Sequence, residues 1–166
     1  MTRRISLISL LGALVFSAAC LKTETSSLVG KNGITSLSTI HQEVVFNAPP
    51  ERVYEALTNP ARFAVLTGRR VAQISDEVGG PFECFDGIIV GRQLELVPGQ
   101  RIVQAWRESD RPVGASTIVQ FELIDLGGTT RLVFDQRGIA PEDLEHLSIG
   151  WKENYWDPMA KYLEAK

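Results

Sequence analysis

The sequence is poor in the residues that build metal centres, with two cysteines and two histidines among 166 residues. A four-ligand zinc site would therefore need carboxylates as well. It also lacks an excess of positive charge, because 17 basic residues stand against 20 acidic ones for a net charge of −3. A nucleic-acid binder needs a basic face to neutralise phosphates, so we expect no nucleic-acid partner. Beyond residue 20 every stretch of 18 residues contains a charged side chain, so we predict no membrane-spanning helix in that part of the sequence.

What remains is an ordinary globular composition, with 44% hydrophobic and 22% charged residues. The length fits one domain, since a single core is usual at about 100–200 residues. The sequence shows no internal repeat. We therefore expect one acidic, folded domain.

The first residues resemble an export signal. Two arginines precede an apolar run over residues 5–19, and small residues lead to Cys20. At about 1.5 Å per residue the run is too short for a hydrocarbon core of about 30 Å, so it is interpreted as a signal peptide over residues 1–19. The Ala-Ala-Cys ending resembles a bacterial lipobox, in which Cys20 would be lipidated and anchor the protein to a membrane. The alternative is ordinary cleavage after Ala19, which leaves Cys20 unmodified. Both predict an exported protein, either a cell-envelope lipoprotein or periplasmic.

Residues 20–38 are rich in Ser, Thr, Gly and Lys and predict a flexible tether. The domain is expected over residues 39–166. Its first strand alternates apolar and polar residues over 40–46. Pro50 opens a short helix, and Asn59 followed by Pro60 indicates the cap and first residue of a second helix that ends near Leu66.

The middle of the chain predicts an antiparallel meander. Glycine-rich turns separate six expected strands, at residues 71–77, 81–85, 88–97, 101–108, 115–125 and 129–137. The Asp86-Gly87 pair is typical of a two-residue hairpin, which needs positive φ at both positions. Short connections without helices require antiparallel neighbours. We expect one curved sheet.

The C-terminal segment predicts a long helix that begins at Pro141. Its apolar stripe recurs every three or four residues and includes Trp151, Tyr155 and Tyr162. Pro158 is expected to kink it, because the ring clashes with the carbonyl four residues earlier. Such a helix laid across a curved sheet would enclose space between them.

Several motifs follow one another in the order of a known family. They are residues 48–58 (APPERVYEALT), 79–82 (GGPF), Gly87, 91–99 (GRQLELVPG), 102–107 (IVQAWR), Gly150-Trp151, Tyr155-Trp156, Pro158-Met159 and Tyr162-Leu163. Together with the order of elements they resemble the START-like (SRPBCC) superfamily. Within it, residues 40–164 resemble the C-terminal domain family of the activator of the 90-kDa heat-shock protein ATPase. The resemblance implies an α+β helix-grip fold with a cavity between the sheet and the C-terminal helix.

The resemblance implies more than one activity. In eukaryotes the domain is a co-chaperone module that works beside a separate N-terminal domain, and residues 21–38 are too few to form one. A chaperone partner is expected only if the chain stays cytoplasmic, which export would prevent. Relatives in the superfamily bind lipids, sterols or polyketides, and some are cyclases. Fold alone does not choose among these.

Catalytic chemistry has little support in the sequence. Glu142, Asp143 and Glu145 favour the start of a helix through its dipole. His146 has Glu142 one turn earlier, which indicates a surface pair more than an acid–base pair. Cys84 is expected to be a small core residue. No catalytic triad order, phosphate-binding glycine loop or metal-ligand spacing is present. We therefore expect a protein that is not an enzyme and needs no cofactor; a cyclase or hydrolase is the most distant alternative.

The better candidates are side chains predicted to face the cavity. The aromatic ones are Phe85, Trp106, Phe134, Trp151 and Tyr155. Alternation places Arg92 in phase with Val90 and Leu94, and Gln104 in phase with Ile102. If those faces look inward, Arg92 and Gln104 are buried polar groups that orient an acidic or carbonyl-bearing ligand. They could equally form an internal hydrogen-bond network.

Two hypotheses of different class follow. An exported module that binds a small hydrophobic ligand predicts an open pocket of about 300 Å³ or more. A chaperone-interacting module predicts a filled core, an exposed apolar patch and a cytoplasmic chain.

Overall fold

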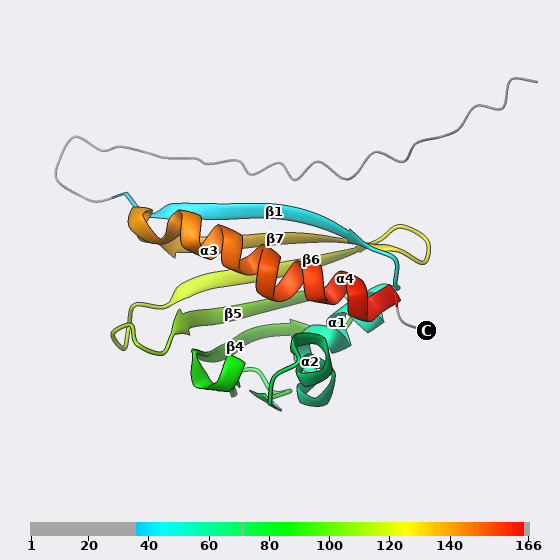
Figure 1. Cartoon of the computed structure of the whole chain (residues 1–166), viewed down its shortest axis with the longest axis horizontal. Helices are drawn as coiled ribbons and strands as arrows, with labels where there is room; N and C mark the ends of the chain where they lie inside the picture. The colour runs from blue at the N-terminus through cyan, green and yellow to red at the C-terminus, as the bar shows by residue number, and fades with distance from the viewer. Residues whose placement is uncertain (1–35, 71, 165–166) are drawn as a thin grey trace, which may run out of the picture.

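The computed structural model describes residues 36–70 and 72–164. The predicted signal peptide, Cys20 and most of the predicted tether lie outside these residues. One antiparallel sheet has the strand order β1-β7-β6-β5-β4-β3-β2. Figure 1 shows the C-terminal helix lying across one face of this sheet, with two short helices near the C-terminal end of that helix. This is the predicted α+β helix-grip architecture.

The bounds of the elements follow the predicted order. The strands are β1 (Ser38–Phe46), β2 (Gln73–Ile74), β3 (Pro81–Cys84), β4 (Ile89–Val97), β5 (Arg101–Glu108), β6 (Thr117–Asp125) and β7 (Thr130–Ile139). The helices are α1 (Pro50–Thr58), α2 (Pro60–Thr67), α3 (Leu144–Trp151) and α4 (Asp157–Glu164), with short turns η1 (Phe85–Gly87) and η2 (Pro141–Asp143) and a π-helical segment η3 (Lys152–Trp156). Among the described helices, none is long and apolar enough to span a membrane.

The two short helices form for local reasons. Pro50 and Pro60 each occupy a first helical turn, where the missing N–H costs nothing. The Asn59 side chain accepts hydrogen bonds from the amides of Ala61 (3.0 Å) and Arg62 (3.1 Å). The predicted cap is confirmed.

Two local predictions differ from the structure. The expected strand 71–77 is reduced to β2, because the Glu77 amide donates to the Ser75 hydroxyl at 3.2 Å and turns the chain. The expected two-residue hairpin at Asp86-Gly87 is a longer turn that also includes Phe85. Just before Pro158, where a kink is predicted, the helix widens into η3, in which the Asp157 amide bonds to the Lys152 carbonyl.

The alternation of β4 changes phase within the strand. Gln93 pairs with Gln104 and Glu95 pairs with Val103, so Leu94 is an extra residue in a β-bulge. Gln93 before the bulge and Leu96 after it therefore face the same side, although they are three residues apart. As a result the inner face of β4 carries odd-numbered residues first and even-numbered residues afterwards.

The core between sheet and helix is mostly aromatic. Phe121 and Phe134 lie 5.4 Å apart on the sheet, and Trp151 of α3 packs 4.3 Å from Phe134. Trp156 of η3 stacks at 5.7 Å from Trp151. All four side chains are buried. These rings fix the position of the helix over the sheet.

Candidate functional site

Glutamines on the sheet anchor two of the three tryptophans. Trp151 Nε1 donates to Gln136 Oε1 at 2.6 Å, and Trp156 Nε1 donates to Gln42 Oε1 at 2.6 Å. The Gln136 amide donates onward to the Thr117 hydroxyl at 2.8 Å, and the Gln42 amide donates to Ser148 at 3.1 Å. Each buried N–H thus has a buried acceptor, as low-dielectric interiors require. The helix is fixed to both β1 and β7.

Trp106 of β5 is the exception. Its side chain is 5% exposed, and its Nε1 is buried without a hydrogen bond to any described residue. An unsatisfied buried donor costs about 1–3 kcal/mol, so it requires an explanation.

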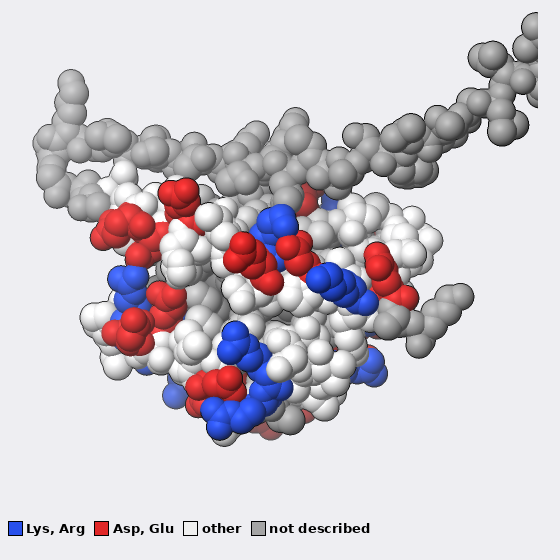
Figure 2. All heavy atoms as spheres, in the orientation of Figure 1, with Lys and Arg blue, Asp and Glu red and all other residues white. Residues whose placement is uncertain are grey.

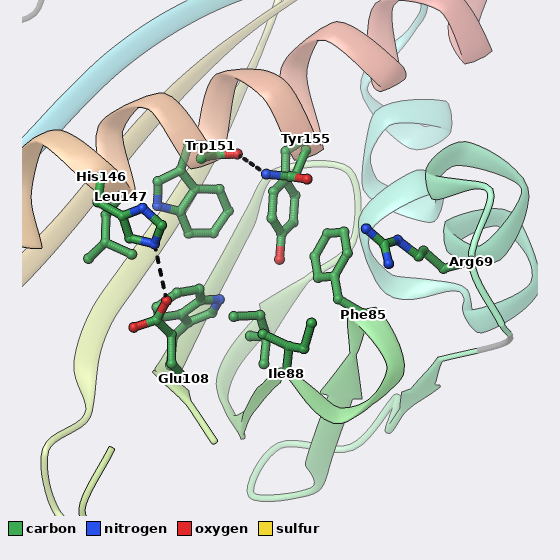
Figure 3. Close-up of a pocket in the computed structure, with 12 residues that line it drawn as sticks. Arg69, Phe85, Ile88, Glu108, His146, Leu147, Trp151 and Tyr155 are labelled. Atoms are coloured by element: carbon green, nitrogen blue, oxygen red, sulfur yellow. Dashed lines mark hydrogen bonds and ion pairs between the residues drawn. The ribbon is translucent and has the colours of Figure 1, made fainter. Parts of the chain in front are cut away.

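Trp106 lines a pocket of about 200 Å³ beside the end of α3. The other apolar walls are Phe85, Ile88, Ile89, Leu147, Trp151 and Tyr155. The polar members are Arg69, Glu108, His146 and Asn154, and Gly150 leaves space in the helix wall. Figure 3 shows Phe85 and Tyr155 side by side at one wall, and His146 opposite Glu108 at the other. The pocket is smaller than the 300 Å³ expected for a ligand-binding module.

The rest of the space under the helix is filled. An inner void of only about 10 Å³ lies among Leu57, Phe63, Cys84, Gln104 and Tyr155. A wider hollow of about 370 Å³ lies on the other side of Trp106, around Arg111 and Asp143. These two side chains pair with each other at 2.6 Å, and therefore satisfy their own charges. Trp106 borders both spaces, but the first pocket is the better candidate because there Trp106 is joined by the aromatic side chains of Phe85, Trp151 and Tyr155.

Burial keeps two ionisable groups near the pocket neutral. Burial raises the pKa of Cys84 to about 12. Burial also raises the pKa of Tyr155 well above its ordinary value; the neighbouring Cys84 adds to this, and the Trp106 indole, which is close but makes no well-formed hydrogen bond, acts in the opposite direction. Both groups are therefore neutral near pH 7. At the rim, the hydrogen bond from Arg70 lowers the pKa of Asp86.

The two histidines lie in different places. His146, at the rim of the pocket, has its Nε2 3.5 Å from Glu108 Oε1, so its partner is on β5 and not the predicted Glu142. His41 lies away from the pocket, with Nδ1 2.9 Å from Asp135 Oδ1 across the β1–β7 pair. Among residues 36–70 and 72–164, no three His, Cys, Asp or Glu side chains are grouped to hold a metal ion.

Four of the predicted cavity residues line the pocket: Phe85, Trp106, Trp151 and Tyr155. Phe134 is instead fully buried beneath Trp151. Gln104 faces the interior, where its amide donates to Gln93 Oε1 at 3.1 Å in an internal network. This is the second of the two outcomes considered for Gln104.

The expected inward orientation of Arg92 is wrong. Its side chain is exposed and donates to the Gly79 carbonyl at 2.9 Å. The reason is the β-bulge at Leu94, because alternation counted back from Leu96 assigns Arg92 to the wrong face. The residue that faces inward is Gln93, which is 0% exposed.

Sequence reasoning also missed Gln42 and Gln136 as partners of the tryptophans. A usable signal existed, since Gln42 is in phase with Ile40 and Phe46, and Gln136 is in phase with Phe134. A glutamine on an apolar strand face needs a buried partner. Which tryptophan supplies it depends on where the helix crosses the sheet.

The charged surface is mixed. Figure 2 shows acidic and basic side chains interspersed on the face in view. Arg69 and Arg70 both pair with Asp86. Arg62, the third arginine near α2, pairs with Glu55 at 2.8 Å.

Comparison with known proteins agrees with the fold. Activator of 90 kDa heat shock protein ATPase homolog 1 from Homo sapiens is 30% identical over 112 residues, which are 68% of this chain and 33% of that protein. A homolog 2 from Mus musculus is 26% identical over 75% of this chain and 38% of its own length. The chain thus spans little more than a third of these relatives.

Solved structures give the same result. A protein from Chromobacterium violaceum is 31% identical, with a TM-score of 0.63 over 77% of this chain and 98% of that one. An HSP90 activator from Plasmodium falciparum has a TM-score of 0.70 at 24% identity, over 75% of this chain and 95% of that one. Residues 47–164 match the family described as Activator of Hsp90 ATPase homolog 1-like protein. Together with the helix-grip fold, this match shows that the chain belongs to that START-like family.

Proposed function

We propose that this protein is a non-enzymatic binding module whose pocket beside Trp106 takes a small, mainly apolar ligand with one hydrogen-bond acceptor. The observation that carries the proposal is the buried Trp106 N–H without a hydrogen bond, whereas the N–H groups of Trp151 and Trp156 each have a glutamine acceptor. A ligand acceptor would supply the missing bond. The aromatic walls would supply the rest of the affinity, as in most small-molecule sites.

The size and charge of the pocket support a compact, uncharged ligand. Its volume of about 200 Å³ has room for a single substituted ring. The charged side chains that line it have partners in the protein, since Glu108 lies 3.5 Å from His146 and Arg69 lies 3.8 Å from Asp86. The Tyr155 hydroxyl in the wall is neutral near pH 7 and provides no base, which supports binding over catalysis.

The proposal is tested by calorimetric titration of the full chain with acetophenone, a phenyl ring that carries one carbonyl acceptor. Trp106→Phe keeps an aromatic ring and removes the N–H, so we expect acetophenone to bind about 3- to 10-fold more weakly, as for one neutral hydrogen bond. Ethylbenzene has nearly the same shape and no acceptor, and its affinity should not follow this change. Equal losses for both compounds would contradict a role for the N–H, and no binding of either to the unmodified protein would overturn the proposal.

A second variant tests the location of the ligand. Gly150 lines the pocket, and an added Cβ would have only Asn154 Nδ2 nearby, at 4.0 Å. Gly150→Ala should therefore leave the fold intact and take space from the pocket. We expect it to weaken acetophenone and ethylbenzene alike, in contrast to Trp106→Phe. Unchanged affinity for both compounds would place their site elsewhere.

We further propose that the chain is exported and anchored through a lipidated Cys20. The apolar run before Cys20 and its small-residue ending support this. Intact mass spectrometry of the membrane and soluble fractions should find a membrane-bound species that begins at Cys20 and carries acyl mass. A soluble species that begins at Cys20 without acyl mass would retain export and contradict lipidation.

The second candidate is a chaperone-interacting module, favoured by the names of the human and mouse relatives. The filled core under the helix also fits it, because the inner void is about 10 Å³. The same mass measurement separates the candidates. A soluble full-length chain that retains Met1 would contradict export and make the chaperone-linked role the leading one.

A further inference from the structure

The turn that closes the inner wall of the pocket has a backbone conformation that its first residue rarely adopts. Phe85, Asp86 and Gly87 have φ angles of 53°, 59° and 88° in succession. Glycine adopts such angles freely and aspartate tolerates them, but a bulky residue does so only where its surroundings enforce it. Outliers of this kind cluster at clamps and switch regions. The question is what holds Phe85 there.

Two sets of contacts hold the turn. The Phe85 ring is buried and packs edge-on at 5.4 Å from Phe63 and 5.2 Å from Tyr155. Outside the pocket, Asp86 Oδ1 accepts a hydrogen bond from Arg70 Nε at 2.8 Å, and Arg69 lies 3.8 Å from Oδ2. The ring therefore fills a slot between two other rings, while the exposed ion pair fixes the backbone.

The Phe85 ring lines the outer pocket and packs against Phe63 and Tyr155, two residues that line the inner void. Phe85 and Tyr155 line the outer pocket, whereas Phe63, Cys84 and the same Tyr155 line the inner void. Phe63 and Tyr155 are 5.8 Å apart, so the three rings form one continuous plug. Displacing Phe85 would join the outer pocket to the void and expose Cys84 behind it.

We propose that Phe85 is a specificity-determining gate, latched by Asp86 and Arg70, whose displacement admits the apolar tail of a longer ligand between Phe63 and Tyr155. The ligand class is thus an elongated apolar molecule with its acceptor at the Trp106 end. This inference rests on the proposed function of the pocket. The backbone strain at Phe85 favours opening, and a tail that replaces the ring restores the lost aromatic contacts.

The rate at which the Cys84 thiol is modified measures opening of the gate without any ligand. In a Cys20→Ser background Cys84 is the only thiol of the chain, and it is buried. We would measure its rate of modification by methyl methanethiosulfonate in the full chain. Asp86→Asn removes the latch charge and keeps a residue that tolerates positive φ, so we expect modification to be about 3-fold faster, which is the size of an exposed ion pair.

The matched control is Asp157→Asn, which breaks the exposed Lys152–Asp157 pair of 2.7 Å far from the turn. It should not alter Cys84 modification. If Asp86→Asn has no effect, or if both variants accelerate modification equally, the latch is overturned. Urea unfolding of each variant shows whether a faster rate follows a loss of global stability, which would also count against a local gate.

The ligand-binding test compares acetophenone with hexanophenone, a phenyl ketone whose alkyl chain is four carbons longer. In Phe85→Ala the tail no longer has to displace the ring, so the affinity ratio of hexanophenone to acetophenone should rise by about 10-fold, well within what burial of several methylenes supplies. An unchanged ratio would overturn the gate. If neither ketone binds the unmodified protein, the proposed function fails, while the Cys84 rates still decide whether Phe85 moves.

Discussion

Replacing Trp151 by phenylalanine is expected to lower the free energy of unfolding by about 3 kcal/mol, through a buried acceptor left unsatisfied and a cavity left by the smaller ring. Trp151 is 2% exposed and packs 4.3 Å from Phe134 and 4.2 Å from Tyr155. Its N–H is the donor to Gln136 Oε1, and Gln136 is 0% exposed. Phenylalanine cannot make this bond, so the buried amide oxygen of Gln136 loses its donor. Urea denaturation followed by far-ultraviolet circular dichroism measures the loss.

Trp106→Phe is the matched control, since it is the same chemical change at the other end of the same aromatic cluster. Trp106 lies 5.5 Å from Trp151 and is nearly as buried. Its N–H has no partner among the described residues, so its removal relieves a cost at the same time as the smaller ring loses contacts. We expect a net change within about 1 kcal/mol. Equal losses in the two variants would contradict the assignment of partners to these indoles.

The comparison of the two variants connects stability with function. The Trp151 bond places the helix on the sheet, and Gln136 continues through the Thr117 hydroxyl to the Trp106 carbonyl at 3.0 Å. The network therefore reaches the Trp106 backbone and stops short of its indole N–H. The indoles of Trp151 and Trp156 have well-formed hydrogen bonds inside the molecule, whereas the Trp106 N–H lies near the Tyr155 hydroxyl without making one. This difference is the physical basis for treating the Trp106 pocket as a site.

The fold was predictable where the local pattern is regular. The strand expected at 101–108 matches β5 in full, because its alternation is uninterrupted between two strong turns. The family motifs predicted the match over 40–164, and the family match covers 47–164. The errors lie where a single residue changes the phase or the hydrogen bonding, as at the Leu94 bulge and the Ser75 turn. Neither feature leaves a periodic signal.

The candidate site was predictable in its aromatic walls but not in its polar detail. Phe85, Trp106, Trp151 and Tyr155 fall on the expected faces, since aromatic residues at strand and helix spacing are driven inward by burial. Which indole keeps a free N–H depends on the crossing of the helix over the sheet, and this is a tertiary property. The strained backbone at Phe85 is equally invisible in the sequence, where the Asp86-Gly87 pair suggests an unstrained hairpin.

The second large effect is expected at Gly91, a strand glycine directly beneath an aromatic ring. Gly91 pairs with Phe82 of β3 on one side and with Trp106 of β5 on the other. An added Cβ would clash with Phe82 Cζ and, more severely, with the Ala105 carbonyl oxygen. The Phe82 ring can move, but a backbone carbonyl inside the sheet cannot. We expect Gly91→Ala to lower the free energy of unfolding by about 3 kcal/mol, at the upper end of overpacking costs.

Gly128→Ala provides the control for the conformational part of a glycine substitution. Gly128 has a φ of 95° and nothing within 4 Å of an added Cβ, so only backbone strain is introduced. A loss of about 1–2 kcal/mol is expected there, from the left-handed conformation alone. Adding Phe82→Leu to Gly91→Ala should recover only part of the larger loss, because the contact with the Ala105 carbonyl remains. Full recovery in the double variant would mean that the aromatic ring alone excludes a side chain, and that β4 and β5 can move apart next to Trp106.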